Sequence, residues 1–254
     1  MKIYQKIILF LIIFTVGFYF ARVYGANYIQ ILISDLGGLT YLYSTVGIIF
    51  ALFAAFVILF EAERWNNLID SVKGEVGELN ELLLWSMHLP EKLKTSFEKD
   101  IKEYLENLIS VGWQIEKTGE KNTASEEILG SLHNDVYQIL KEAPDLMPTA
   151  FSTFSEVIKH REKRIHYASF HLPRILKNTL VFSDILLVVL SLFIGVHNTF
   201  LDYFFLTSIA ILGYIIYQLV DDMDNPIRQG GWHVTTKDYE MLLTKLNANS
   251  MTHE

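Results

Sequence analysis

The sequence predicts an all-α integral membrane protein, with four transmembrane helices and a cytoplasmic helical domain inserted between the second and the third. Of its 254 residues, 51% are hydrophobic, and they gather in a few long segments instead of recurring at core-like intervals. Between these segments the apolar residues follow a helical period, without the alternation typical of strands. The predicted parts are a transmembrane hairpin (1–61), the cytoplasmic domain (62–173), a second transmembrane hairpin (174–220) and a cytoplasmic C-terminal segment (221–254).

Four apolar segments approach the roughly 20 residues that a helix needs to cross a hydrocarbon core about 30 Å thick. They are Ile7–Ala21, the uncharged Leu36–Phe60, Asn178–His197 and Tyr203–Leu219. The first also resembles a secretory signal peptide, because Lys2 and Lys6 precede the apolar run and "VYGA" follows it. We expect it to be retained as a span, since it is long and aromatic and the later topology needs an even number of crossings.

Basic residues beside the spans predict their orientation. Lys2 and Lys6 precede the first span, whereas the two loops expected on the other side contain only Arg22 between them. Six basic residues precede the third span: Lys159, Arg161, Lys163, Arg164, Arg174 and Lys177. Both termini and the middle domain are therefore expected in the cytoplasm, as parts of a multi-pass protein of a cell inner membrane.

The polar middle of the chain is expected to form an antiparallel bundle of helices. Apolar residues recur with a helical period from Glu61 to about Pro173. Pro90 separates the first amphipathic run from the second. Thr123 and Glu126 form the capping-box pattern that opens the third.

Composition and motifs argue against several classes of function. The formal net charge is −8, which leaves no basic face for nucleic acid. The chain has no cysteine and therefore no thiol chemistry. It carries no phosphate-binding loop, dinucleotide fingerprint, paired-histidine metalloprotease motif or nucleophile elbow. We therefore expect no enzyme, no cofactor and no bound metal.

Two clusters invite a metal interpretation that their spacing disfavours. His160, His166 and His171 stand six and five residues apart, on different sides of a helix and among basic neighbours, so hydrogen bonding is the competing interpretation. A polar motif follows the fourth span: Asp221, Asp222, Asp224, Asn225 and Pro226. It lacks the regular spacing of a calcium loop, and a solvated helix end is the alternative to a calcium site.

Asp184 lies one to two turns into the third span, where a carboxylate is costly. An acid at such a depth is by default a candidate for function. The alternative is a structural pair with Lys177 or with the backbone of another helix. The sequence alone favours neither interpretation.

The second span carries an apolar stripe with four-residue spacing, formed by Ile48, Leu52 and Phe56. Small residues suited to close helix contact lie on another side: Ala51, Ala54, Ala55 and Ala62. A helix of this kind can line a pore whose apolar ring closes by dewetting. The alternative is that the stripe faces lipid.

The same span resembles the pore-lining second helix of the bestrophins. Phe56 is followed eight positions later by Arg64, Trp65 and Asn66, with Ile48 and Leu52 eight and four positions before it. Asn225 and Pro226 match the segment at which bestrophins leave the membrane, with Ile227 in place of Phe. The stretches "EAERWNNL" and "REKRIHYASFHLP", and the spacing of Asp224, Pro226 and Gly230, are similar to the bestrophin-like family of bacterial membrane proteins.

This resemblance implies a homo-oligomeric ion channel, expected to be a pentamer of four-span subunits that sit in membrane lipid around a central pore. The second helices would supply an apolar neck of Ile48, Leu52 and Phe56. Arg64, Trp65 and Asn66 would form the junction at which this helix enters the cytosol.

The resemblance leaves the permeant inorganic ion open, because relatives pass anions or cations. The family's calcium clasp follows its Asn-Pro segment, whereas the acids here precede Asn225, so calcium gating is not carried over. The alternative function is a non-conducting membrane scaffold or sensor whose cytoplasmic helical domain binds a protein partner.

Overall fold

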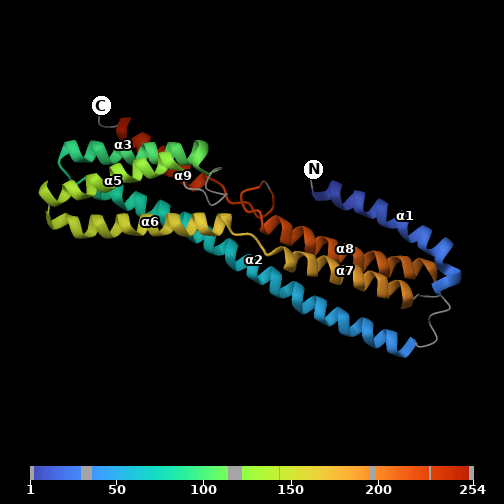
Figure 1. Cartoon of the computed structure of the whole chain (residues 1–254). Coiled ribbons are helices and arrows are strands. Elements are labelled where there is room, and N and C mark those ends of the chain that lie inside the picture. The colour runs from blue at the N-terminus through green and yellow to red at the C-terminus, as the bar shows by residue number, and fades with distance from the viewer. Residues whose placement is uncertain are drawn as a thin grey trace. The chain divides into compact units, whose positions relative to one another are not determined.

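The computed structural model describes residues 3–29, 36–113, 122–142, 144–194, 198–228 and 230–251. Within these ranges the chain is helical and contains no strand, as the sequence predicts. Figure 1 shows the α-helices α1 (Ile3–Ile29), α2 (Leu36–Ser86), α3 (Glu91–Asn107), α5 (Thr123–Glu142), α6 (Met147–Ser169), α7 (Arg174–Ile194), α8 (Thr199–Met223) and α9 (Lys237–Met251). Two short turns of other helix types are η2 (Leu108–Gly112) and η3 (Pro144–Leu146).

The helices form two compact units. The first unit contains Met1–Ala62 and Leu172–Asp224, and the second contains Glu63–His171 and Asn225–Glu254. The C-terminal stretch therefore belongs to the same unit as the middle of the chain. The assignment of these parts to membrane and cytoplasm stays a prediction.

Three helices of the described chain include a stretch long and apolar enough to cross a membrane: Thr40–Ser86, Arg174–Ile194 and Thr199–Met223. In α1 the apolar stretch is shorter, Ile8–Phe20. The arrangement of four spans stays a prediction. Lys2 and residues 195–197, which carry part of the predicted orientation and of the third span, lie outside the described residues.

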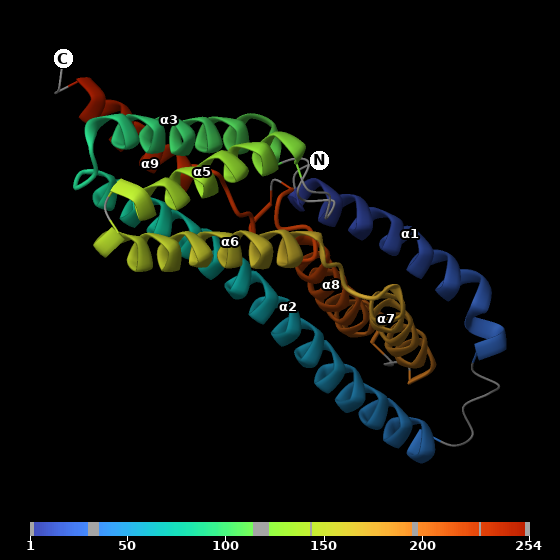
Figure 2. The ribbon, with the colours of Figure 1, turned by 60° about the vertical axis from the view of Figure 1, so that its left-hand side comes forward.

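The first unit is held together by apolar and aromatic contacts. α7 and α8 lie side by side in both views (Figure 1 and Figure 2). α1 packs on α8 through Phe10, whose ring stacks on that of Tyr214 with centroids 4.4 Å apart. The core between α2, α7 and α8 contains Phe50, Ala54, Val57, Leu172, Leu180, Leu187 and Val220. Where these side chains would otherwise meet water, their burial stabilises the packing of the helices.

The second unit packs α3, α5, α6, α9 and the polar half of α2 around one apolar core. Its most enclosed members include Leu68, Leu79, Leu82, Phe97, Ile101, Leu105, Leu108 and Leu132. Pro90 precedes the first residue of α3 and separates it from α2, as the sequence predicts. At the start of α5 the predicted capping box is wrong. Asn122 Oδ1 accepts the Ala124 N–H at 3.1 Å, because Thr123 is already the first helical residue.

Candidate functional site

α2 has one buried and one exposed face along most of its length. The buried face consists of Phe50, Ala54, Val57, Glu61, Arg64, Leu68, Ser71, Glu75, Leu79, Leu82 and Ser86. These positions recur at the helical repeat of about 3.6 residues, which keeps them on one side. The opposite, exposed face runs through Tyr41, Thr45, Ile48, Leu52, Phe56, Leu59, Glu63, Asn66 and Asp70. This continuous exposed face is the candidate functional site.

The three predicted neck residues lie on this exposed face. Their exposed fractions are 62% for Ile48, 69% for Leu52 and 59% for Phe56. Most of their apolar surface therefore touches no other part of the described chain. Leu59 continues the apolar surface at 69% exposure, so the stripe is longer than the sequence indicated.

The small residues of α2 do not form the single packing face that the sequence suggested. Ala54 is buried, whereas Ala51 and Ala55 are exposed. Gly47 faces α7 at an ordinary packing distance, since a Cβ on Gly47 would lie 3.9 Å from a methyl group of Leu187. Packing among the described residues thus leaves most of the apolar side-chain surface on the exposed face of α2 uncovered.

Of the three predicted junction residues, Arg64 and Trp65 pack against other parts of the chain, whereas Asn66 is exposed. The Arg64 guanidinium is buried and donates a hydrogen bond to the carbonyl of Phe170, just after α6. The indole of Trp65 makes an edge contact with Trp232, with centroids 4.9 Å apart. Asn66 lies on the exposed face. Sequence reasoning missed Trp232, because no local pattern joins residues so far apart.

Asp184 of α7 lies directly against Gly213 of α8, and a Cβ at Gly213 would overlap its carboxylate. Its Oδ1 atom is enclosed and has no hydrogen-bond partner among the described residues. The alternative pair with Lys177 does not form, since the Lys177 ammonium lies 2.5 Å from an Asp224 oxygen and 3.5 Å from Asp221. Glycine is needed at 213 because only its bare Cα leaves room for the acid.

The acids after the fourth predicted span hold the end of α8 next to the start of α7. The buried Asp224 carboxylate accepts the Leu172 N–H at 2.6 Å and pairs with Lys177. Beyond it, Pro226 O accepts the Val234 N–H at 2.8 Å and so turns the chain back. The Asp224 oxygens are therefore engaged by protein donors. Within the described ranges, no three His, Cys, Asp or Glu side chains are grouped to hold a metal.

The histidines do not converge on one point. The His160 ring packs on Gly74 of α2, where any side chain would overlap it. The His166 ring instead makes an edge contact with Tyr167, with centroids 5.2 Å apart. Packing thus accounts for these two rings, and Gly74 is the sequence signal for the first contact.

A fully buried ionic network lies in the second unit, and sequence reasoning missed it. Glu75 is 0% exposed and Arg164 of α6 is 1% exposed, with Arg164 Nε donating to Glu75 Oε2 at 2.7 Å. Tyr104 and Tyr239 donate their hydroxyl hydrogens to the same carboxylate, at 2.5 and 3.0 Å. The Arg164 guanidinium lies over the ring of Trp113, 5.5 Å from its centroid. Every charge in this network is thus neutralised and hydrogen-bonded.

Two of the six basic residues that precede the third predicted span are therefore internal. Arg164 pairs with Glu75, and the buried Arg161 donates to Glu126 at 2.7 Å. Neither presents its charge to a membrane surface. The orientation itself stays a prediction.

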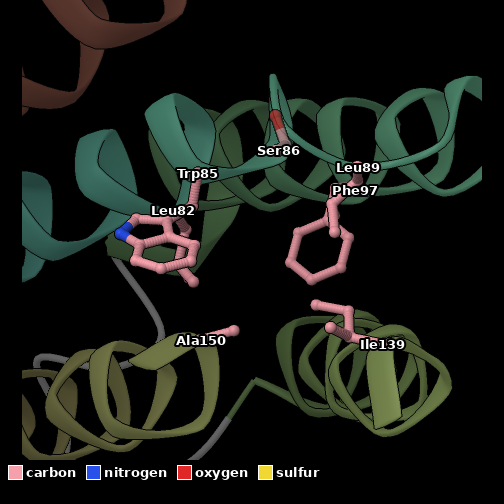
Figure 3. A pocket seen from close by; sticks show the side chains of 7 residues that line it. All are labelled: Leu82, Trp85, Ser86, Leu89, Phe97, Ile139 and Ala150. Atoms are coloured by element: carbon pink, nitrogen blue, oxygen red, sulfur yellow. The ribbon is translucent and has the colours of Figure 1, made fainter. Parts of the chain in front are cut away.

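A small apolar pocket lies where α2, α3, α5 and α6 meet (Figure 3). It is lined by Leu82, Trp85, Ser86, Leu89, Phe97, Ile139 and Ala150. None of these side chains titrates, and the Ser86 hydroxyl donates to the Leu83 carbonyl at 2.7 Å. This pocket offers neither a general acid nor a general base.

The chain is similar to known proteins over most of its length. A model of the bestrophin-like domain matches residues 9–234. One crystal structure of a variant bestrophin homologue from the bacterium Klebsiella pneumoniae has a TM-score of 0.79 and 14% identity, covering 96% of this chain and 98% of that one. A second variant of it gives a TM-score of 0.76 and 13% identity over the same shares. No curated protein matches this chain in sequence.

Proposed function

Because the chain belongs to the bestrophin-like family, we propose that it is one subunit of a homopentameric ion channel in a bacterial inner membrane. Four spans per subunit, with both termini in the cytoplasm, contact membrane lipid. The copies of α2 surround the pore and turn their exposed faces toward its axis. Ile48, Leu52 and Phe56, the neck residues, then form three stacked apolar rings.

The observation that carries this proposal is the continuity of the exposed face of α2. Other helices also expose apolar side chains, for example Ile8 and Ile12 of α1, and lipid contact is sufficient to explain those. On α2, however, the exposed face continues from Leu59 to the polar Glu63, Asn66 and Asp70 on the same helix. An apolar constriction that leads into a hydrated surface is one way to build a gated path for ions.

The proposed neck works by excluding water. A narrow ring of Ile, Leu and Phe side chains dewets, and an ion cannot enter it without losing its hydration shell. A small rotation of α2 widens and wets the ring. Beyond the neck, Glu63 and Asp70 would place rings of carboxylates beside the path, which favours cations over anions.

Ion flux into liposomes tests the neck. Replacing Ile48, Leu52 and Phe56 together by Ala should raise the flux, because the widened ring stays wet. The matched control replaces Ile8, Ile12 and Val16 of α1, which are exposed and have the same four-residue spacing. Its flux should equal that of the natural protein. Background flux in all three proteins would contradict the channel and favour a membrane scaffold that binds a protein partner.

A further inference from the structure

Two buried acids of the second unit lie on helices that pack against each other. α3 carries Asp100 and α5 carries Asp135, and these two helices lie side by side in both views (Figure 1 and Figure 2). Only 7% of Asp100 and 6% of Asp135 is exposed. Neither acid belongs to the exposed face of α2, so the proposed ion path does not account for them.

Each of these acids has a carboxylate oxygen without a partner. The Oδ2 atoms of Asp100 and Asp135 are enclosed and accept no hydrogen bond from the described residues. Such an oxygen is costly to bury unless a donor or a cation compensates it. Burial raises the pKa of the Asp135 carboxyl, a hydrogen bond from Ser96 of α3 lowers it in part, and the charge of Asp100 raises it further. The two acids are therefore close enough to repel each other.

Within the described chain, no basic side chain supplies the missing positive charge. Neither Asp100 nor Asp135 forms an ion pair there. Lys99 and Lys102 stand one and two positions from Asp100, and side chains at these spacings do not face each other on a helix. The His133 ring lies against Phe154 of α6, with centroids 5.9 Å apart.

The pair of acids lies at the rim of the helical bundle. Ser131 and Gln138 are the neighbours of Asp135 one turn away on either side along α5, and both are exposed. Leu132 and Val136, on the adjoining side of the same helix, are buried in the core. A small hydrated ion therefore reaches the acids from solvent without crossing the apolar core.

We propose that Asp100, Asp135 and Ser96 bind one hard divalent cation of the size of Mg²⁺ between α3 and α5. Ser96 and Asp100 are one turn apart on α3, so both face α5 together. Carboxylate oxygens and water are the preferred ligands of Mg²⁺, which is commonly held by few carboxylates while it keeps several waters. Ca²⁺ takes about six to eight oxygen ligands, which this small set does not supply. The cation cancels the repulsion between the acids and links α3 to α5, whether or not the chain conducts ions.

Thermal unfolding of the purified full-length protein tests this site. Saturation with MgCl₂ to about ten times the Kd should raise the melting temperature by about 3 °C or more over its value in EDTA. Asp100→Asn and Asp135→Asn should each abolish this shift, because a neutral amide replaces one carboxylate ligand. The matched control is Asp145→Asn, which changes an exposed acid and should keep the full shift.

Mn²⁺, which takes the same oxygen ligands, measures the binding directly. Electron paramagnetic resonance of the free ion should give one bound Mn²⁺ per subunit in the natural protein and in Asp145→Asn. The Kd should rise about tenfold or more in the Asp100→Asn and Asp135→Asn variants, and several-fold in Ser96→Ala, which keeps both acids.

Three outcomes would overturn the site. The first is a natural protein that neither binds Mn²⁺ nor responds to MgCl₂. The second is equal Mn²⁺ affinity in the natural protein and in all the variants. The third is an Asp135→Asn variant that is more stable than the natural protein by the same margin in MgCl₂ and in EDTA, because the two acids would then share a proton instead of a cation.

Discussion

The two halves of α2 are packed by different physical means. Toward the first unit, its buried face consists mainly of apolar side chains such as Phe50, Ala54 and Val57, with the acid Glu61 near the boundary. In the second unit the same face includes the buried Arg64, Ser71 and Glu75, each with a hydrogen-bond partner. Apolar contacts tolerate small rotations of a helix, whereas a buried ion pair fixes its register. The comparison indicates that buried hydrogen bonds add to apolar packing in the second unit, whereas apolar packing dominates in the first.

The largest expected effect is a loss of stability when the ionic network in the polar half of α2 is broken. Arg164→Met leaves the Glu75 carboxylate buried without its cation, which should cost about 3–5 kcal/mol of unfolding free energy. Thermal unfolding of the purified protein measures this loss. Adding Glu75→Met should recover part of the stability, because no unpaired charge remains, although the buried Tyr104 and Tyr239 hydroxyls lose their acceptor.

Lys163→Met is the matched control for that experiment, since Lys163 precedes Arg164 but is exposed. The free energy of unfolding of this control should stay within about 0.5 kcal/mol of that of the natural protein. Equal losses in the two variants would mean that the ionic network does not fix the polar half of α2.

A smaller effect, on ion preference, is expected from substitutions in the polar part of the exposed face of α2. Glu63→Gln with Asp70→Asn removes two carboxylates from the hydrated part of the proposed path while the hydrogen-bonding shapes stay similar. The preference for cations over anions should fall about fivefold, equivalent to roughly 1 kcal/mol. Reversal potentials in a salt gradient measure this ratio. Exposed Glu142→Gln on α5 is the control, and an equal shift there would indicate a general surface effect.

The smallest effect concerns a pair of acids in the second unit. Asp100 and Asp135 are both buried, and the Oδ2 atom of each lacks a hydrogen-bond partner among the described residues. Burial raises the pKa of the Asp135 carboxyl, the Ser96 hydrogen bond lowers it in part, and Asp100 raises it further. The folded state thus favours the protonated acid more than the unfolded chain does. Its contribution is fully present below the unfolded pKa and is lost as pH rises through the folded pKa.

Asp135→Asn imitates the protonated acid, so it should stabilise the protein at neutral pH and make no difference in acid. The difference in melting temperature between the variant and the natural protein, followed against pH, measures this. Exposed Asp145→Asn should show no such dependence. A constant difference at every pH would contradict the assignment.

Local patterns predicted much of this molecule. The apolar segments of α2, α7 and α8, the break at Pro90 and the helical character of the whole described chain follow from period, length and proline chemistry. The predicted apolar stripe at Ile48 could be identified because its members lie four residues apart on one helix. Its role as a neck stays a prediction.

Contacts between distant segments could not be predicted from the sequence. Glu75 and Arg164 are 89 residues apart, and the sequence groups Arg164 only with the basic residues that precede the third predicted span. The sequence suggests Asp184 as a partner of Lys177, and only the fold shows that Lys177 pairs with Asp224. Such choices depend on which helices pack together, and the local period of a sequence does not contain that information.

The account depends on the exposed face of α2 meeting its own copies. In the cysteine-free chain, Leu52→Cys introduces one thiol at the centre of the proposed neck, and Ile12→Cys places one on α1 as a control. Oxidation of the intact membranes, followed by a non-reducing gel, shows which thiols meet. The account predicts disulfide-linked dimers for Leu52→Cys and monomers for Ile12→Cys. Linked Ile12→Cys beside monomeric Leu52→Cys would contradict it.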